Sequence, residues 1–71
     1  MMGHRMDISV NGLVREIDEG STVDQLITGL GLNPAGVAVA VNRAVVPRSS
    51  RSSHTLQPDD RVEIIQAVGG G

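Results

Sequence analysis

Residues 6–30 read MDISVNGLVREIDEGSTVDQLITGL, and the first half of this stretch predicts a β-hairpin. Apolar and polar residues alternate on the way to the pair Asn11-Gly12, with the period of two that a strand requires. Asn-Gly is the strongest short-range signal for a two-residue turn between strands, because both residues tolerate the positive φ angles of a type I′ turn. The returning strand places Leu13 and Ile17 on one face.

The second half of the stretch predicts an amphipathic helix. Thr22 can cap the first turn, and Gln25 follows three residues later, as in a capping box. Two nearby glycines and Pro34 end the helix. The apolar residues recur at the spacing of one helical face, at Val23, Leu26, Ile27 and Leu30. A helix this short requires a sheet on which to pack.

The rest of the chain predicts three further strands. Residues 36–42, GVAVAVN, are almost entirely apolar, which is typical of a strand buried on both faces. A turn and a short strand follow and end at Pro47. After a polar loop, residues 61–68 read RVEIIQAV and place Val62 and Ile64 on one face. These elements predict an α+β fold with a mixed sheet of about five strands, the last strand beside the first, and one main helix packed across one face.

A chain of 71 residues is enough for one domain. We expect this domain at residues 6–68, with a disordered N-terminal extension or cloning remnant at residues 1–5 and a flexible glycine tail at residues 69–71. The core must be built without aromatic side chains, because the sequence contains no Phe, Tyr or Trp. The predicted core residues are Ile8, Val10, Ile17, Val23, Leu26, Ile27, Leu30, Val37, Val39, Val41, Val62 and Ile64.

Composition excludes several classes of function. The chain has no cysteine, which rules out disulfides, thiolate metal sites and cysteine nucleophiles. Its net charge of −2 and its lack of aromatic side chains argue against nucleic-acid binding. No stretch reaches the roughly 18 apolar residues of a membrane span. We therefore expect a cytoplasmic protein with neither a nucleic-acid nor a membrane partner.

The side chains predict neither a catalytic nor a metal site. His4 and His54 have no partner at metal-ligand spacing, and no serine lies in a nucleophile-elbow context. Arg43, Arg48 and Arg51 are compatible with an anion-binding patch, a contact surface for an acidic partner or an ordinary solvated loop. We expect no metal, no catalytic residue and no permanently bound cofactor.

The chain ends in Gly69, Gly70 and Gly71, directly after the last predicted strand. A frayed end is the simplest interpretation. A glycine tail is also thin enough to enter a narrow channel in another protein, because glycine has no side chain. The carboxylate of Gly71 would become a good electrophile if a partner enzyme adenylated it. This second interpretation predicts a protein substrate and carrier, not an enzyme.

Four segments resemble the ubiquitin-like β-grasp sulfur carriers, and among these the ThiS family of thiamine biosynthesis. They are ISVNG at 8–12, GSTVDQLI at 20–27, GVAVAVNRAVVPR at 36–48 and DDRVEIIQAVGGG at 59–71. The most specific parts are the N-x-x-x-V-P-R pattern that ends at Arg48 and the terminal A-V-x-G-G pattern. The resemblance spans nearly the whole chain from Met6, and it implies the ubiquitin-like β-grasp fold.

The resemblance also implies a mechanism. An ATP-dependent activating enzyme (ThiF-like) would adenylate the carboxylate of Gly71. A sulfur donor such as a cysteine desulfurase system would supply the sulfur that converts the adenylate to a thiocarboxylate. A thiazole synthase (ThiG-like) would then take this sulfur into the thiazole. The protein would carry covalent sulfur, and ATP would be consumed by the activating partner.

The family architecture further implies which residues contact the partners. Gly69 and Gly70 would carry the reacting end into the active sites of the partner enzymes. Docking would involve Ile65, Ala67 and Val68. The third glycine, Gly69, departs from many family members and lengthens the thin part of the tail.

Other functions stay open. The small subunit of molybdopterin synthase also ends in Gly-Gly and passes sulfur as a thiocarboxylate, but it is usually longer and has Phe and Pro before the glycines, where this chain reads IIQAV. A sulfur carrier for cysteine synthesis is a related alternative. In a different class, a non-catalytic β-grasp interaction module with a disordered tail would make the glycines dispensable.

Overall fold

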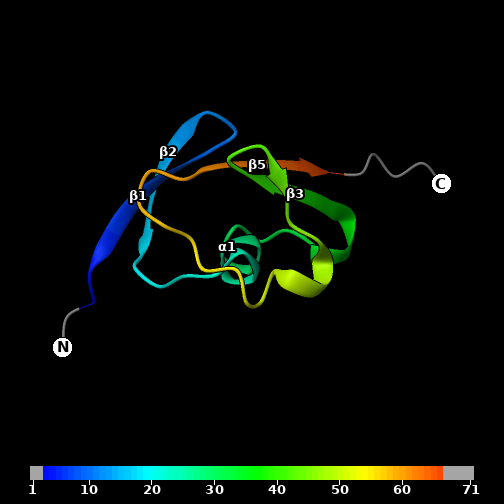
Figure 1. Cartoon of the computed structure of the whole chain (residues 1–71), viewed down its shortest axis with the longest axis horizontal. Coiled ribbons are helices and arrows are strands. Elements are labelled where there is room, and N and C mark those ends of the chain that lie inside the picture. The colour runs from blue at the N-terminus through cyan, green and yellow to red at the C-terminus, as the bar shows by residue number, and fades with distance from the viewer. Residues whose placement is uncertain (1–2, 67–71) are drawn as a thin grey trace.

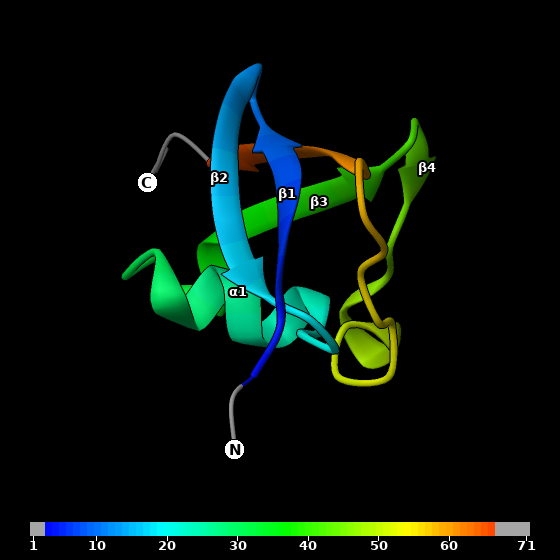
Figure 2. The same ribbon diagram turned by 90° about the vertical axis from the view of Figure 1, so that its left-hand side faces the viewer.

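The computed structural model describes residues 3–66, in which a five-stranded mixed sheet packs on one α-helix (Figures 1 and 2). The sheet order is β2-β1-β5-β3-β4, and β5 runs parallel to β1 and antiparallel to β3. The predicted α+β class and the place of the last strand beside the first are confirmed. The elements are β1 (Arg5–Val10), β2 (Leu13–Asp18), α1 (Val23–Gly29), β3 (Val37–Val41), β4 (Ala44–Val45) and β5 (Arg61–Gln66), with the 3-10 helices η1 (Pro34–Gly36) and η2 (Arg48–Ser50) in the connections.

The β1–β2 hairpin turns where the sequence predicted. Asn11 and Gly12 have φ angles of 51° and 86°, as a type I′ turn requires. Leu13, however, is 67% exposed, whereas Ile17 on the same face packs partly against the core. The helix has seven residues and is about 10 Å long, so it crosses one end of β2 and does not reach the tip of the hairpin (Figure 2).

Strand β1 begins one residue before the expected domain boundary at Met6. Arg5 is its first residue and pairs with Asp18 of β2. The backbone contacts extend further, because the carbonyl of His4 accepts the N–H of Glu19 at 2.8 Å. The extension predicted at residues 1–5 therefore overlaps the folded domain.

Helix α1 has the predicted capping box. The Thr22 side chain accepts the N–H of Gln25 at 3.2 Å, and the Gln25 side chain accepts the N–H of Thr22 at 2.9 Å. The helix ends in a Schellman motif around Gly31, whose φ is 76°, because Leu32 donates its N–H to the carbonyl of Ile27. Both ends of the helix are thus set by residues that the sequence analysis identified.

The core lies between α1 and the face of the sheet that α1 covers. Ile17 and Leu30, which the sequence placed in the core, are only partly buried. Met6, Val46 and Leu56 are buried although the sequence analysis did not select them. The buried apolar residues are Met6, Ile8, Val10, Val23, Leu26, Ile27, Val37, Val39, Val41, Val46, Leu56, Val62 and Ile64.

Strand β3 corrects one prediction. Its three valines are buried as expected, but Ala38 is exposed and Ala40 is only half-buried. The expectation of burial on both faces was wrong, because among residues 3–66 only one face of the sheet is covered by a helix. The opposite face, which we call the outer face, is open to contact.

Candidate functional site

The candidate site starts at the end of β5, because the predicted glycine tail follows this strand. β5 pairs with β3 as far as Gln66, which lies opposite Val37. Val62 and Ile64 point into the core, and Ile65 points to the outer face, where it is 69% exposed. The other predicted site residues lie outside the described residues: Ala67, Val68, Gly69, Gly70 and Gly71.

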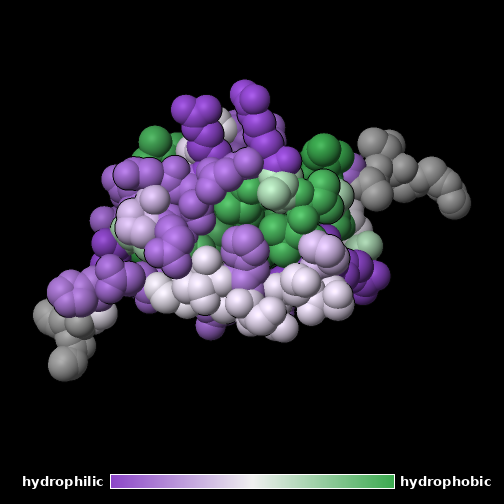
Figure 3. Space-filling view, viewed as in Figure 1, coloured by the Kyte–Doolittle hydropathy of each residue, from purple (hydrophilic) through white to green (hydrophobic). Residues whose placement is uncertain are grey.

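Ile65 belongs to an apolar patch on the outer face. It lies opposite Ala38 of β3, and Ala40 of the same strand lies opposite Val45 of β4, which is 76% exposed. On its other side, Ala40 lies opposite the exposed Glu63 of β5, so a carboxylate borders these apolar side chains. We call Ala38, Ala40, Val45 and Ile65 the outer patch. Hydrophobic atoms are visible at the surface beside the end of β5 in Figure 3. Exposed apolar patches of this kind mark contact sites for other molecules. The alternation of valine and alanine in residues 37–41 did not show that the alanine face is open, and nothing in the sequence joined the alanines to Val45.

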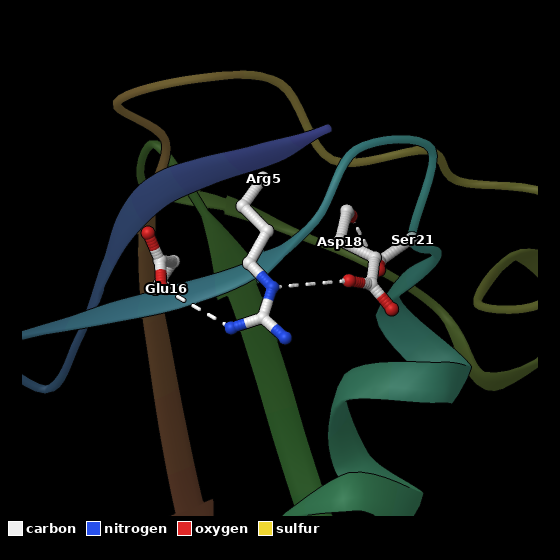
Figure 4. Close-up of polar contacts among 4 residues, drawn as sticks. All are labelled: Arg5, Glu16, Asp18 and Ser21. Carbon is white, nitrogen blue, oxygen red and sulfur yellow. Dashed lines mark hydrogen bonds and ion pairs between the residues drawn. The ribbon is translucent and has the colours of Figure 1, made fainter. Parts of the chain in front are cut away.

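The other half of the outer face is charged. Arg5 of β1 forms ion pairs with Glu16 at 3.3 Å and Asp18 at 3.6 Å, both on β2 (Figure 4). These side chains are exposed, so the pairs contribute only about 0–1 kcal/mol each to stability. They make the β1–β2 half of this face mostly polar, although Val14 of β2 is 73% exposed there. The apolar half therefore adjoins the end of β5.

The arginine cluster of the sequence analysis does not form a patch. Arg51 is buried, with 4% exposure, and its guanidinium donates hydrogen bonds to the carbonyls of Pro34 at 2.9 Å and Val37 at 2.6 Å. Arg43 lies in the β3–β4 turn and Arg48 opens η2, both exposed. A three-arginine anion site is therefore wrong, because one of its members is a structural residue inside the fold.

The Ser21 side chain makes a contact with the backbone of its own turn. Ser21 lies in an open hollow of about 800 Å³ between β2 and α1, but its hydroxyl donates to the backbone carbonyl of Asp18 at 2.6 Å and not to a base. Within residues 3–66, no group of three or more His, Asp or Glu side chains is placed to hold a metal ion. No helix in that range is long and apolar enough to cross a membrane.

Comparison with known proteins identifies the family. The model of the ThiS family matches residues 8–71, which is nearly the whole chain. This chain belongs to the ThiS family. The sulfur carrier protein ThiS of Escherichia coli is 33% identical over 66 residues, covering 93% of this chain and 100% of that protein.

A solved structure supports the same family. The crystal structure of the thiamine biosynthesis protein ThiS from Geobacter metallireducens matches with a TM-score of 0.80 and 30% identity, over 93% of this chain and 100% of that one. The β-grasp fold implied by the resemblance is thereby confirmed for this ThiS-family chain.

One relative is a longer protein. The thiazole synthase of Magnetococcus marinus is 41% identical over 66 residues, which are 93% of this chain but 20% of that protein. The chain thus spans about a fifth of the length of this relative. A ThiS-like segment is part of the same polypeptide as the rest of that thiazole synthase.

Proposed function

We propose that this ThiS-family protein carries sulfur for thiazole formation in thiamine biosynthesis and that the carboxyl group of Gly71 is the attachment point. The observation that carries the proposal is the family match over residues 8–71, because it joins the β-grasp domain and the terminal glycines in one pattern. The names of the relatives favour the thiazole pathway over the molybdopterin and cysteine alternatives.

The transfer has two steps at Gly71. First, a carboxylate oxygen attacks the α-phosphate of ATP inside a ThiF-like activating enzyme, and pyrophosphate leaves. Second, a thiol reductant releases hydrosulfide from the persulfide of a desulfurase-type donor and is itself oxidised to a disulfide, and the hydrosulfide attacks the acyl carbon. The carbon–oxygen bond to AMP then breaks, and AMP leaves with the electron pair. The product is a thiocarboxylate, and the carrier supplies the acyl group while its partners supply the catalysis.

The proposed contacts divide between the tail and the outer patch. Gly69 and Gly70 enter the active site of each partner, because residues without side chains need the least space there. Ile65, Ala67 and Val68 dock against the partner surface. A ThiG-like thiazole synthase is the proposed acceptor, and the relative that contains a ThiS-like segment within a thiazole synthase supports this choice.

An intact-mass experiment tests the function. The protein is incubated with ATP, a ThiF-like activating enzyme and a sulfur source, and we expect a mass increase equal to the exchange of one oxygen for one sulfur. Deletion of Gly69, Gly70 and Gly71 together should abolish this increase and leave the far-UV circular dichroism and the thermal midpoint unchanged, because the deleted residues follow β5 in the sequence. An unmodified full-length chain, or equal modification of the deletion variant, would contradict the proposal.

A further inference from the structure

Two turn asparagines hold strand β5, one near each end. Asn11 in the β1–β2 turn and Asn42 in the β3–β4 turn each occupy the first turn position, and each has a φ of 51°. Both side chains reach from their own hairpin to the backbone of β5. The central strand β5, which precedes the glycine tail in the sequence, therefore accepts side-chain hydrogen bonds from the turns of both neighbouring hairpins or donates to them.

Asn11 extends the pairing between β1 and β5 by one step. Its Oδ1 accepts the N–H of Ile64 at 2.8 Å, and its Nδ2 donates to the carbonyl of Ile64 at 3.1 Å. Its own backbone N–H donates to the carbonyl of Val62 at 2.9 Å. The backbone pairing of β1 with β5 covers Arg61 and Val62 and stops there, because β1 ends at Val10. The side-chain amide of Asn11 provides the hydrogen bonds to Ile64 that a longer β1 would have made with its backbone. These bonds pair both polar groups of the Asn11 side chain with the backbone of Ile64, although Asn11 itself is an exposed residue.

Among residues 3–66, the Ile64 contact is the last hydrogen-bonded contact on this edge of β5. Beyond Ile64, the residues that pair with β5 come from β3, with Ala38 opposite Ile65 and Val37 opposite Gln66. Asn11 and β3 thus hold opposite edges of the strand close to the point where residue 67 begins. A two-point amide contact resists both displacement and rotation of the strand about its own axis.

We propose that Asn11 is a positioning residue that sets the direction in which β5 presents the tail to its partner enzymes. This inference rests on the proposed function. A rotation of the strand at Ile64 turns the next residue, Ile65, away from its place on the outer face, and Ile65 is one of the residues proposed to dock against the partner. Misplacement of reacting groups by about 1 Å can cost about a hundredfold in rate. The amide of Asn11 reduces this misplacement without touching the reacting atoms.

Asn42 provides a matched control within the same fold. Its Oδ1 accepts the N–H of Arg61 at 2.9 Å, and its Nδ2 donates to the Asp60 carboxylate at 2.9 Å. It therefore makes two side-chain bonds from the same turn position, but at the opposite end of β5. Glycine fits the positive φ at either site, so Asn11→Gly and Asn42→Gly remove the amide and keep the turn.

Hydrogen exchange provides the first measurement. In Asn11→Gly, we expect amide exchange at Ile64 to accelerate by about tenfold, because its N–H loses the acceptor that Asn11 Oδ1 provides. In Asn42→Gly, exchange should accelerate at Arg61 and stay unchanged at Ile64. Asn11→Asp keeps the acceptor for the Ile64 N–H and loses the donor to its carbonyl, so we expect an intermediate effect.

The rate of thiocarboxylate formation provides the second measurement. We expect kcat/KM of the activating enzyme for the carrier to fall by about tenfold with Asn11→Gly and to be unchanged with Asn42→Gly, at a temperature where both variants are fully folded. Equal rates for the two variants would overturn the positioning role. If the wild-type protein formed no thiocarboxylate, the proposed function would fail, whereas a working wild type with equal variants would refute this inference alone.

Discussion

At the scale of single residues, Arg51 is the feature that sequence reasoning misplaced. It lies in a polar stretch, but its side chain is buried and donates to two backbone carbonyls, those of Pro34 and Val37. Its own carbonyl accepts the N–H of Asp24 at the start of α1. One residue therefore joins the η2 segment to the start of β3 and to the helix. A local sequence cannot indicate this, because all three partners come from other segments.

Replacement of Arg51 by Met tests its structural role. We expect Arg51→Met to lower the free energy of unfolding by about 1.5–3 kcal/mol, because two carbonyls lose charged donors. Urea unfolding measures the change. The exposed Arg48 provides the control, since Arg48→Met should stay within about 0.5 kcal/mol of the wild type. A more stable Arg51→Met variant would mean that burying the charge costs more than its hydrogen bonds contribute.

At the scale of elements, α1 is the part that the sequence predicted best. Its signals are local: a cap residue, its reciprocal partner three residues later and a glycine at the end. The apolar stripe also matches the buried residues Val23, Leu26 and Ile27. Each of these features acts within a few residues of the chain, so it can be recognised without knowing the rest of the fold.

The capping box should have a measurable effect on stability. We expect Thr22→Ala to lower the free energy of unfolding by about 1 kcal/mol, because the N–H of Gln25 loses its acceptor. Thermal unfolding followed by circular dichroism detects the change. Thr28 is exposed within the same helix, and Thr28→Ala should be neutral or slightly stabilising. Equal effects of the two substitutions would show that the cap contributes nothing specific.

The strands were less predictable than the helix. The alternating valines identified β3 and its core face, but the alanines between them gave no indication that the other face lies open. Leu13 has the periodicity of a core residue and is nevertheless exposed. In both cases, burial depends on whether another layer covers the strand, and the length and position of α1 decide that.

At the scale of the whole molecule, the outer face divides into two halves of different chemistry. The charged half contains the Arg5 ion pairs on β1 and β2. The outer patch occupies β3, β4 and the end of β5, next to the start of the tail. A partner that binds the tail is therefore within reach of the apolar half, and burying exposed apolar residues there favours association.

The position of the outer patch predicts that Asp substitutions at Ile65 and at Val14 have different effects on the affinity for a partner enzyme. We expect Ile65→Asp to weaken binding of a ThiF-like or ThiG-like partner by about 1–2 kcal/mol, because it places a charge in the outer patch. Isothermal titration calorimetry measures the affinity. Val14 is similarly exposed, at 73% against 69%, but lies on β2, so Val14→Asp should leave the affinity nearly unchanged. Equal weakening by both substitutions would place the docking surface elsewhere.

Short-range spacing in the sequence was enough to predict the order of elements, the two helix ends, the type I′ turn and most of the core. The sequence also contained the terminal glycines on which the proposed function rests. The folded structure was needed to show that Ala38, Ala40, Val45 and Ile65 lie together, that Arg51 is internal and that Asn11 holds Ile64, because each of these contacts joins residues from different segments. Asn11 and Ile64 are 53 positions apart, and the parallel pairing of the first and last strands brings them together.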